Sequence, residues 1–220
     1  MGLELIAERI RAVLDARNRA RDEAVVLSRE VVRTCANSIR AAHRGETDRA
    51  REMLRGARDA VSRMQVALAP FPEVYQAGYV HDCQKEFTEA IAFLAVVSEE
   101  GLPAPEDLGV EFPAYLNGLG EAVGELRRHT LDRMRQGDLS RAEALLNAMD
   151  EIYHMLVTMD YPDALTGGLR RTTDVTRGII EKTRGELTTA LRQEELRTTI
   201  VHALAVLERT AAPGISEGAA

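Results

Sequence analysis

Hydrophobic residues recur every three or four positions along nearly the whole chain, and no segment shows a convincing alternation with a period of two. This pattern predicts an all-α protein. The predicted helices span residues 3–44, 47–68, 73–100 and 114–136, then a helix that ends near residue 159, then 163–194 and a short seventh that reaches residue 209. We therefore expect one helical domain over residues 1–209, a bundle of about six to seven long antiparallel helices, and a disordered tail over residues 210–220.

Glycine and proline mark several of the predicted helix ends. Gly45 is suited to cap the first helix, which is unusually long for a globular domain. Pro70 and Pro72 end the second helix, because proline lacks the amide hydrogen that an interior helical position needs. Residues 101–113 contain several prolines and glycines and are predicted to form a connecting loop.

Two pairs of glutamates lie at helical spacing on what should be neighbouring helices. Glu86 precedes Glu89 by three residues, and Glu121 lies four residues before Glu125 in the second pair. Each pair therefore shares one side of its helix, where like charges repel by roughly 0.2 to 0.5 kcal/mol per pair. A divalent cation would offset that cost. Carboxylates without paired cysteines or histidines favour Mg²⁺, Mn²⁺ or Ca²⁺ over zinc or copper.

Solvated glutamate pairs are the competing interpretation, because 35 of the 220 residues are acidic. Against this interpretation, Glu86 shares a side of its helix with Cys83, Ala90 and Phe93. Its carboxylate is therefore expected at the edge of a buried stripe, where an ionised group costs more free energy than at the surface. This placement favours a functional site.

The predicted helix over 114–136 contains three glycines around its glutamate pair, at positions 118, 120 and 124. Glycine inside a helix costs about 1 kcal/mol relative to alanine, so these glycines imply close approach of a neighbouring backbone or access for a ligand. The five histidines occur singly and are interpreted as core or surface residues, except that His129 follows Glu125 by four residues and could reach the same site. Cys35 and Cys83 are interpreted as small buried hydrophobic residues.

The basic residues are almost all arginine, 26 against two lysines, and they are unevenly distributed. Residues 1–63 hold 14 arginines against 10 acidic residues, a net charge of +4, whereas the remainder holds 14 basic against 25 acidic residues, a net charge of −11. With about 100° per residue, four arginines of the first helix fall within roughly 60° of one another. This arginine row consists of Arg29, Arg33, Arg40 and Arg44. Arginine binds phosphate through a planar fork, so the row is a candidate nucleic-acid-binding surface; pairing with acids or solvent is the competing interpretation.

Composition excludes several other classes of protein. The aromatic content is 4% with no tryptophan, which leaves little material for the base-stacking surfaces of RRM or OB-type domains. The longest uninterrupted apolar run, Ala90 to Val97, is far shorter than the roughly 20 residues that a bilayer span requires. The first residues carry acids and no long apolar stretch, and position 6 is neither serine nor threonine, so neither a signal peptide nor a myristoylation signal is predicted. We expect a cytoplasmic protein.

Four segments carry more specific motifs. They are Ser-Arg-Glu-Val-Val-Arg-Thr-Cys-Ala-Asn-Ser-Ile-Arg-Ala-Ala-His-Arg-Gly-Glu at 28–46, Gln-x-Glu-Phe-x-Glu-Ala at 84–90, Tyr-Leu-x-Gly-Leu-Gly-Glu-Ala-Val-Gly-Glu-Leu at 115–126 and Asp-Tyr-Pro-Asp-Ala-Leu at 160–165. In this order they resemble the translin family, most closely its prokaryotic members. The resemblance extends over about residues 10–195 and implies a translin-like helical domain.

The family contains translin-type subunits, which bind single-stranded nucleic acid, and subunits like translin-associated factor X, which also carry an acidic endoribonuclease site. The metal-binding acids of that second type lie in a Glu-Tyr-x-Glu-Ala segment and an Asp-Leu-Thr-Gly-Glu segment. The corresponding residues here are Glu86, Glu89, Glu121 and Glu125, all acidic. The resemblance therefore implies the nuclease-competent type. Two positions differ: Phe87 stands in place of the tyrosine, and Glu121 in place of the aspartate, which lengthens one ligand by a methylene.

The resemblance thus implies a Mg²⁺-dependent endoribonuclease, with Mn²⁺ as an alternative ion, that binds and cleaves single-stranded RNA. The four glutamates would be the catalytic and metal-binding residues, and the arginine row would bind RNA or single-stranded DNA. Members of the family assemble as hollow octamers with the acidic sites facing inward, which implies a homo-octamer. A non-catalytic single-stranded RNA- or DNA-binding protein of translin type is the main alternative. A helical di-iron carboxylate protein is a third, but the chain lacks the Glu-x-x-His motif expected in both halves.

Overall fold

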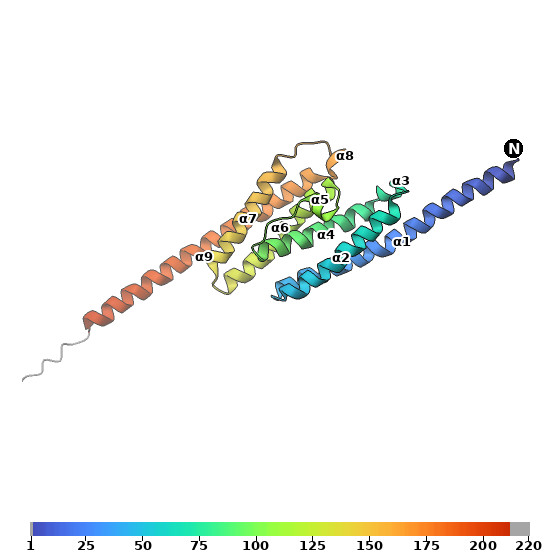
Figure 1. The fold of residues 1–220 in the computed structure, drawn as a ribbon. Helices are drawn as coiled ribbons and strands as arrows, with labels where there is room; N and C mark the ends of the chain where they lie inside the picture. Colours follow the sequence, from blue (N-terminus) through green and yellow to red (C-terminus); the bar gives the residue numbers. More distant parts are fainter. Residues whose placement is uncertain (1, 212–220) are drawn as a thin grey trace, which may run out of the picture.

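The structure, a computed structural model, describes residues 2–211 and is helical in all its regular elements (Figure 1). The helices are α1 (Leu3–His43), α2 (Thr47–Leu68), α3 (Pro72–Tyr75), α4 (Gly78–Val97), α5 (Pro105–Leu108), α6 (Phe112–Arg135), α7 (Leu139–Val157), α8 (Asp163–Thr166) and α9 (Leu169–Ala211). The all-α prediction is confirmed within this range. The predicted tail over 210–220 begins inside the last turn of α9, and its other residues lie outside the described range.

Two predicted helices match closely. The helix predicted over 47–68 is α2, and the helix predicted over 3–44 is α1, which ends one residue earlier at His43. Gly45 follows with a φ of 79°, a left-handed backbone that glycine adopts without strain. The amide of Glu46 then donates to the carbonyl oxygen of Ala41, which closes the end of the helix.

The predictions for three parts of the chain are wrong. The single helix expected over 73–100 is divided into α3 and α4, because Ala77 between them has an extended backbone with a ψ of 144°. The loop expected over 101–113 contains the short helix α5. The helices expected over 163–194 and up to 209 are instead α8 and one continuous α9. The break between these two helices is at Gly167 and Gly168, which have φ values of 61° and 83°.

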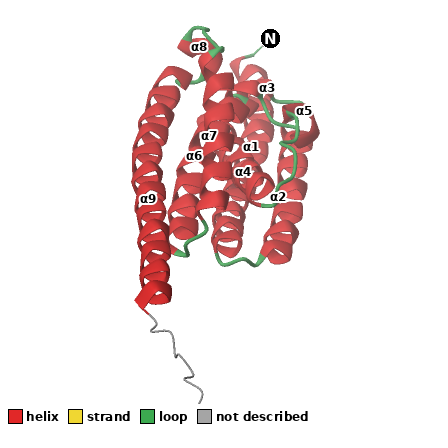
Figure 2. Cartoon of the chain, turned by 90° about the vertical axis from the view of Figure 1, so that its left-hand side faces the viewer, coloured by secondary structure: helices red, strands yellow, loops and turns green. Residues whose placement is uncertain are grey.

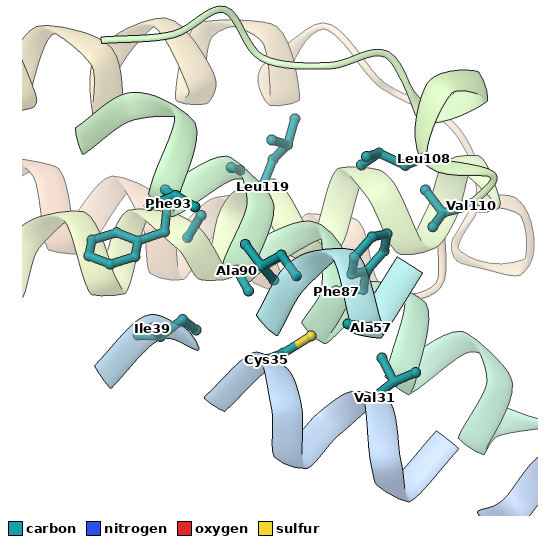
Figure 3. Packing of buried hydrophobic residues seen from close by; sticks show 14 of the residues in the cluster. Val31, Cys35, Ile39, Ala57, Phe87, Ala90, Phe93, Leu108, Val110 and Leu119 are labelled. Carbon is teal, nitrogen blue, oxygen red and sulfur yellow. The ribbon is translucent and has the colours of Figure 1, made fainter. Parts of the chain in front are cut away.

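The long helices pack side by side as a bundle, with α4 and α6 between α1 and α2 on one side and α7 and α9 on the other (Figure 2). Each long helix buries one apolar face. Figure 3 shows Val31 and Cys35 of α1 pointing toward the layer that contains Phe87 of α4. Both cysteines, Cys35 and Cys83, are buried and free, as the sequence predicted.

Two of the three glycines in α6 allow close contact with neighbouring helices. A Cβ atom on Gly118 would lie 2.6 Å from the carbonyl oxygen of Lys85 and 2.6 Å from Cβ of Thr88, both on α4. A Cβ atom on Gly120 would collide with Cγ2 of Thr172 on α9. Gly124, in contrast, has open space around its Cβ position. The predicted close approach of a neighbouring backbone is therefore confirmed at Gly118. Gly120 meets neighbouring side chains only, and Gly124 meets no neighbour.

This difference makes a matched pair of substitutions informative. We expect Gly118→Ala to lower the free energy of unfolding by about 1 to 3 kcal/mol, because α4 and α6 must move apart to admit the methyl group. Gly124→Ala in the same helix should raise it by up to about 1 kcal/mol, because alanine favours the helix and meets no neighbour. Urea unfolding measures both changes. Equal effects of the two substitutions would contradict the close approach of α4 to α6.

The beginning of α1 and the end of α9 extend beyond the rest of the bundle at opposite ends (Figure 1). These protruding ends carry exposed apolar side chains, namely Leu3, Leu5, Ile10, Val13 and Leu14 on α1 and Leu196, Ile200, Val201 and Leu204 on α9. Within residues 2–211, no helix is both long enough and apolar enough to cross a membrane.

Candidate functional site

The structure brings three of the four predicted glutamates together. Glu86 and Glu89 come from α4 and Glu121 comes from α6, and one carboxylate oxygen from each lies within 4.8 Å of the others. All three side chains are half-buried. The close packing of α4 against α6 at Gly118 places the two helices near enough for these carboxylates to converge.

The convergence changes how these groups ionise. Burial, together with the charges of Glu86, Glu121 and Glu125, raises the pKa of Glu89 to about 8. Burial and the charge of Glu121 also raise the pKa of Glu86. These shifts mean that the protein alone leaves the negative charge of the cluster incompletely balanced. A cation bound between the carboxylates would favour their ionised forms.

Lys85 supplies part of that balance. Its Nζ donates to Oε1 of Glu121 at 2.7 Å, and the side chain is largely enclosed. Burial acts to lower the pKa of Lys85, but the hydrogen bond to Glu121 and the surrounding carboxylates outweigh it, and the pKa is raised. One ammonium group therefore faces three carboxylates. Lys85 was not predicted as a site residue, although it stands directly before Glu86 in the chain.

Glu125, the fourth predicted glutamate, is held by a histidine. Nε2 of His43, at the end of α1, lies 2.6 Å from Oε2 of Glu125, and the imidazole side chain is 6% exposed. This hydrogen bond lowers the pKa of Glu125 despite its partial burial. Among the described residues, Glu125 is not part of the three-carboxylate cluster, although its charge contributes to the raised pKa of Glu89. Its role as a metal ligand stays a prediction.

His129 lies behind this pair. Its ring centroid is 5.9 Å from that of His43 and 6.0 Å from that of Phe93, and its Nδ1 is buried without a hydrogen-bond partner in the described part of the chain. Burial, followed by the charge of Arg133, lowers the pKa of His129 to about 4, so the ring is neutral at pH 7. It packs beside His43 and does not join the carboxylate cluster.

A cavity of about 840 Å³ opens beside the cluster. Glu86, Glu89 and Glu121 contribute to its lining from α4 and α6. Gly167 and Gly168 contribute from the turn before α9, and Arg171 and Thr172 from its first turn. Asn117 of α6 ties these parts together. Its Nδ2 donates to the carbonyl oxygen of Thr166 at 2.8 Å, and its Oδ1 accepts from Oγ1 of Thr172 at 2.6 Å.

The arginine row lies elsewhere on the molecule. All four of its side chains are exposed, and they lie on the side of α1 opposite the buried Leu27 and Val31. Arg44 pairs with Glu46 at 2.6 Å, and Arg40 donates to Asn37 at 2.9 Å. None of the four lines the cavity beside the glutamates. The row is thus available to solvent but separate from the cluster within one chain.

Known proteins share this arrangement of helices. No family model matches the chain. An uncharacterised protein of Methanocaldococcus jannaschii is 33% identical over 179 residues, which cover 80% of this chain and 79% of the relative. Two solved structures of Archaeoglobus C3PO, one a complex with duplex RNA, are 35% and 34% identical, with TM-scores of 0.80 and 0.79. Each comparison covers 85% of this chain and 97% of the other. Apo C3PO from Nematostella has the same fold at 20% identity and a TM-score of 0.77, over 86% of this chain and 98% of the other.

The architecture is therefore the all-α fold of the C3PO proteins, which are translin and translin-associated factor X proteins. On this similarity in sequence and structure, the chain belongs to the translin family, as the four sequence motifs predicted.

Proposed function

We propose that this protein is a metal-dependent endoribonuclease that binds and cleaves single-stranded RNA. The observation that carries the proposal is the convergence of three half-buried carboxylates from α4 and α6, with the pKa of Glu89 raised to about 8. Clustering carboxylates in this way costs free energy unless a ligand offsets it. The RNA in the Archaeoglobus C3PO complex supports a nucleic-acid substrate.

The chemistry of the cluster fits Mg²⁺, and Mn²⁺ as an alternative. All the converging atoms are carboxylate oxygens, the ligands that hard divalent cations prefer. Glu86, Glu89 and Glu121 would hold the ion, with Glu125 as the fourth predicted carboxylate. When bound, such an ion polarises a phosphoryl oxygen and lowers the pKa of a coordinated water. The ammonium group of Lys85 would share Glu121 with the ion or turn toward the phosphate.

Side chains of the protein would carry out the proton transfer and orient the attacking water. A carboxylate that does not bind the ion accepts the proton of the attacking water, whose oxygen forms a bond to phosphorus. The phosphorus–oxygen bond to the neighbouring ribose breaks, and the departing oxygen takes up a proton. Glu125 is suited to orient that water, because His43 holds one of its carboxylate oxygens at 2.6 Å and leaves the other available.

Binding of RNA would rest on the phosphate backbone. The exposed arginine row of α1 provides guanidinium groups for phosphates, which gives affinity with little selectivity for bases and a strong dependence on salt. As part of the proposal, copies of the chain assemble as a hollow homo-octamer with the carboxylate clusters facing inward. The arginine row of one chain could then bind an RNA strand that the carboxylate cluster of another chain cleaves.

The test is incubation of the purified protein with end-labelled RNA, single-stranded and duplex, with Mg²⁺ or with EDTA. We expect endonucleolytic cleavage of the single strand that requires the metal. Glu89→Gln should reduce the rate at least 100-fold while RNA binding is retained, because the amide cannot act as an anionic ligand. This variant also controls for contaminating nucleases.

Binding without cleavage across Mg²⁺, Mn²⁺ and several RNA lengths would refute the endoribonuclease. The protein would then be a non-catalytic binding protein. In that case the Lys85–Glu121 ion pair and the His43–Glu125 hydrogen bond would be structural. Cleavage that is unchanged in Glu86→Gln, Glu89→Gln and Glu125→Gln proteins would refute the metal site instead.

A further inference from the structure

The cavity beside the glutamates has a cation that the proposed mechanism does not use. Arg171 lies in the first turn of α9 and lines the cavity together with Gly168 and Thr172. Its side chain is exposed. Within the described part of the chain, its guanidinium group takes part in no hydrogen bond or ion pair. By contrast, the ammonium group of Lys85 is engaged by Glu121 at 2.7 Å.

A phosphate entering this cavity meets carboxylates on α4 and α6, which repel it at short range. A neighbouring cation that is not already paired would offset part of this repulsion. Arginine suits the task, because it stays protonated at all relevant pH values and can donate two parallel hydrogen bonds to one phosphate. The arginine row of α1 cannot do this within the same chain, because none of its members lines the cavity.

The backbone of α9 is fixed relative to the helix that carries Glu121. Oγ1 of Thr172 donates to Oδ1 of Asn117 at 2.6 Å, and Oγ1 of Thr176 contacts the carbonyl oxygen of Gly120 at 3.4 Å. At Gly120, α9 packs so closely against α6 that a Cβ atom there would collide with Cγ2 of Thr172. The base of the Arg171 side chain therefore has a fixed position relative to the carboxylate cluster.

We propose that Arg171 is a positioning residue that binds a backbone phosphate of the RNA strand next to the phosphate to be cleaved. The strand would pass between the start of α9 and the carboxylates of α4 and α6. The inference rests on the proposed function for the identity of the ligand, an RNA phosphodiester. It adds a contact on α9, which lies outside all of the residues expected to bind nucleic acid from the sequence.

The chain offers a matched control in the preceding residue. Arg170 is also exposed and carries the same charge, but it does not line the cavity, and its guanidinium group lies 3.9 Å from Asp160. Arg170→Gln and Arg171→Gln therefore remove the same charge at adjacent positions. A general electrostatic effect would weaken RNA binding equally in both, whereas a specific phosphate contact would affect only Arg171.

The experiment measures binding of fluorescein-labelled single-stranded RNA to the full-length protein in EDTA over a range of salt concentrations. We expect Arg171→Gln to weaken binding by about 5- to 10-fold at 100 mM salt and to reduce the slope of log K against log salt by about 0.7. Arg170→Gln should stay within about twofold of the original protein. Arg171→Lys should recover part of the affinity, because it restores the charge but not the two parallel hydrogen bonds. In Mg²⁺, Arg171→Gln should raise KM more than it lowers kcat.

An unchanged salt slope in Arg171→Gln would overturn the assignment, as would equal weakening in Arg170→Gln or an original protein that does not bind RNA. A change in the mass of the assembly on Arg171→Gln would also overturn it, because the arginine would then contact another copy of the chain. The outcome is separable from that of the proposed function. If Arg171→Gln weakens RNA binding but the original protein does not cleave RNA, the phosphate contact is supported and the endoribonuclease is refuted. If the original protein cleaves RNA and Arg171→Gln changes neither binding nor cleavage, the endoribonuclease is supported and the phosphate contact is refuted.

Discussion

Glu89→Gln should make the metal-free protein more stable at pH 8, by roughly 2 to 4 kcal/mol in the free energy of unfolding, even though it removes a proposed ligand. The carboxyl group of Glu89 ionises near pH 4.5 in an unfolded chain and near pH 8 in the folded one, because burial and three neighbouring glutamates oppose its charge. As pH rises from about 4.5 to 8, the unfolded state loses its proton first, so the stability of the original protein falls. Glutamine has no proton to lose and escapes this decline.

Urea unfolding in EDTA at pH 5 and pH 8 measures the effect. The two proteins should differ little at pH 5 and most at pH 8. Added Mg²⁺ should reverse the order, because an ion bound only by the folded state stabilises the original protein by mass action. A control is Glu143→Gln on α7, whose exposed carboxylate lies outside the cluster. A metal-free Glu89→Gln protein that is no more stable at pH 8 would contradict the crowding of charge in the cluster.

His43→Leu should lower the free energy of unfolding at pH 7 by about 1.5 to 3 kcal/mol, because Glu125 then keeps a half-buried charge without its hydrogen-bond donor. Cleavage should also fall by about 10- to 100-fold, since the carboxylate loses the group that orients it. The stabilisation that His43 gives to ionised Glu125 exists above the unfolded pKa of about 4.5 and is lost as pH falls through the lowered pKa of the folded state. The variant should therefore show a weaker dependence of stability on acid pH.

His43→Gln is the companion variant, because its side-chain amide can still donate a hydrogen bond toward Glu125. It should recover part of the stability and part of the activity that His43→Leu loses. If both variants lose cleavage equally while their stabilities differ, the imidazole itself takes part in the reaction. If neither changes cleavage, the contact between α1 and α6 serves folding alone.

Much of the fold follows from hydrophobic spacing and helix-ending residues. The limits of α2 were predicted from its apolar period and from the prolines that follow it, and the end of α1 from Gly45. The division between α3 and α4 was missed, because no proline at Ala77 indicates the extended backbone there. The glycine pair at 167 and 168, in contrast, is a helix-breaking signal that the sequence analysis overlooked.

Some residues of the candidate site could also be predicted from the sequence, whereas others could not. Glu86, Glu89 and Glu121 could be found because each belongs to a pair of glutamates at helical spacing on one helix. His43 could not be found by spacing, since it lies 82 residues from Glu125 and the two meet only when α1 and α6 both pack against α4. Arg171 is hidden among 26 arginines, and only the cavity distinguishes it from its neighbour Arg170.

The protruding ends of α1 and α9 have a consequence for how the protein behaves on dilution. Their exposed leucines, isoleucines and valines cannot be covered by the bundle from which they extend. In the proposed octamer, neighbouring chains would cover these side chains, so that part of the free energy of folding would come from association. The melting temperature would then fall as the protein is diluted. A single chain at nanomolar concentration would be a poorer scaffold for the carboxylates than the same chain in a concentrated solution.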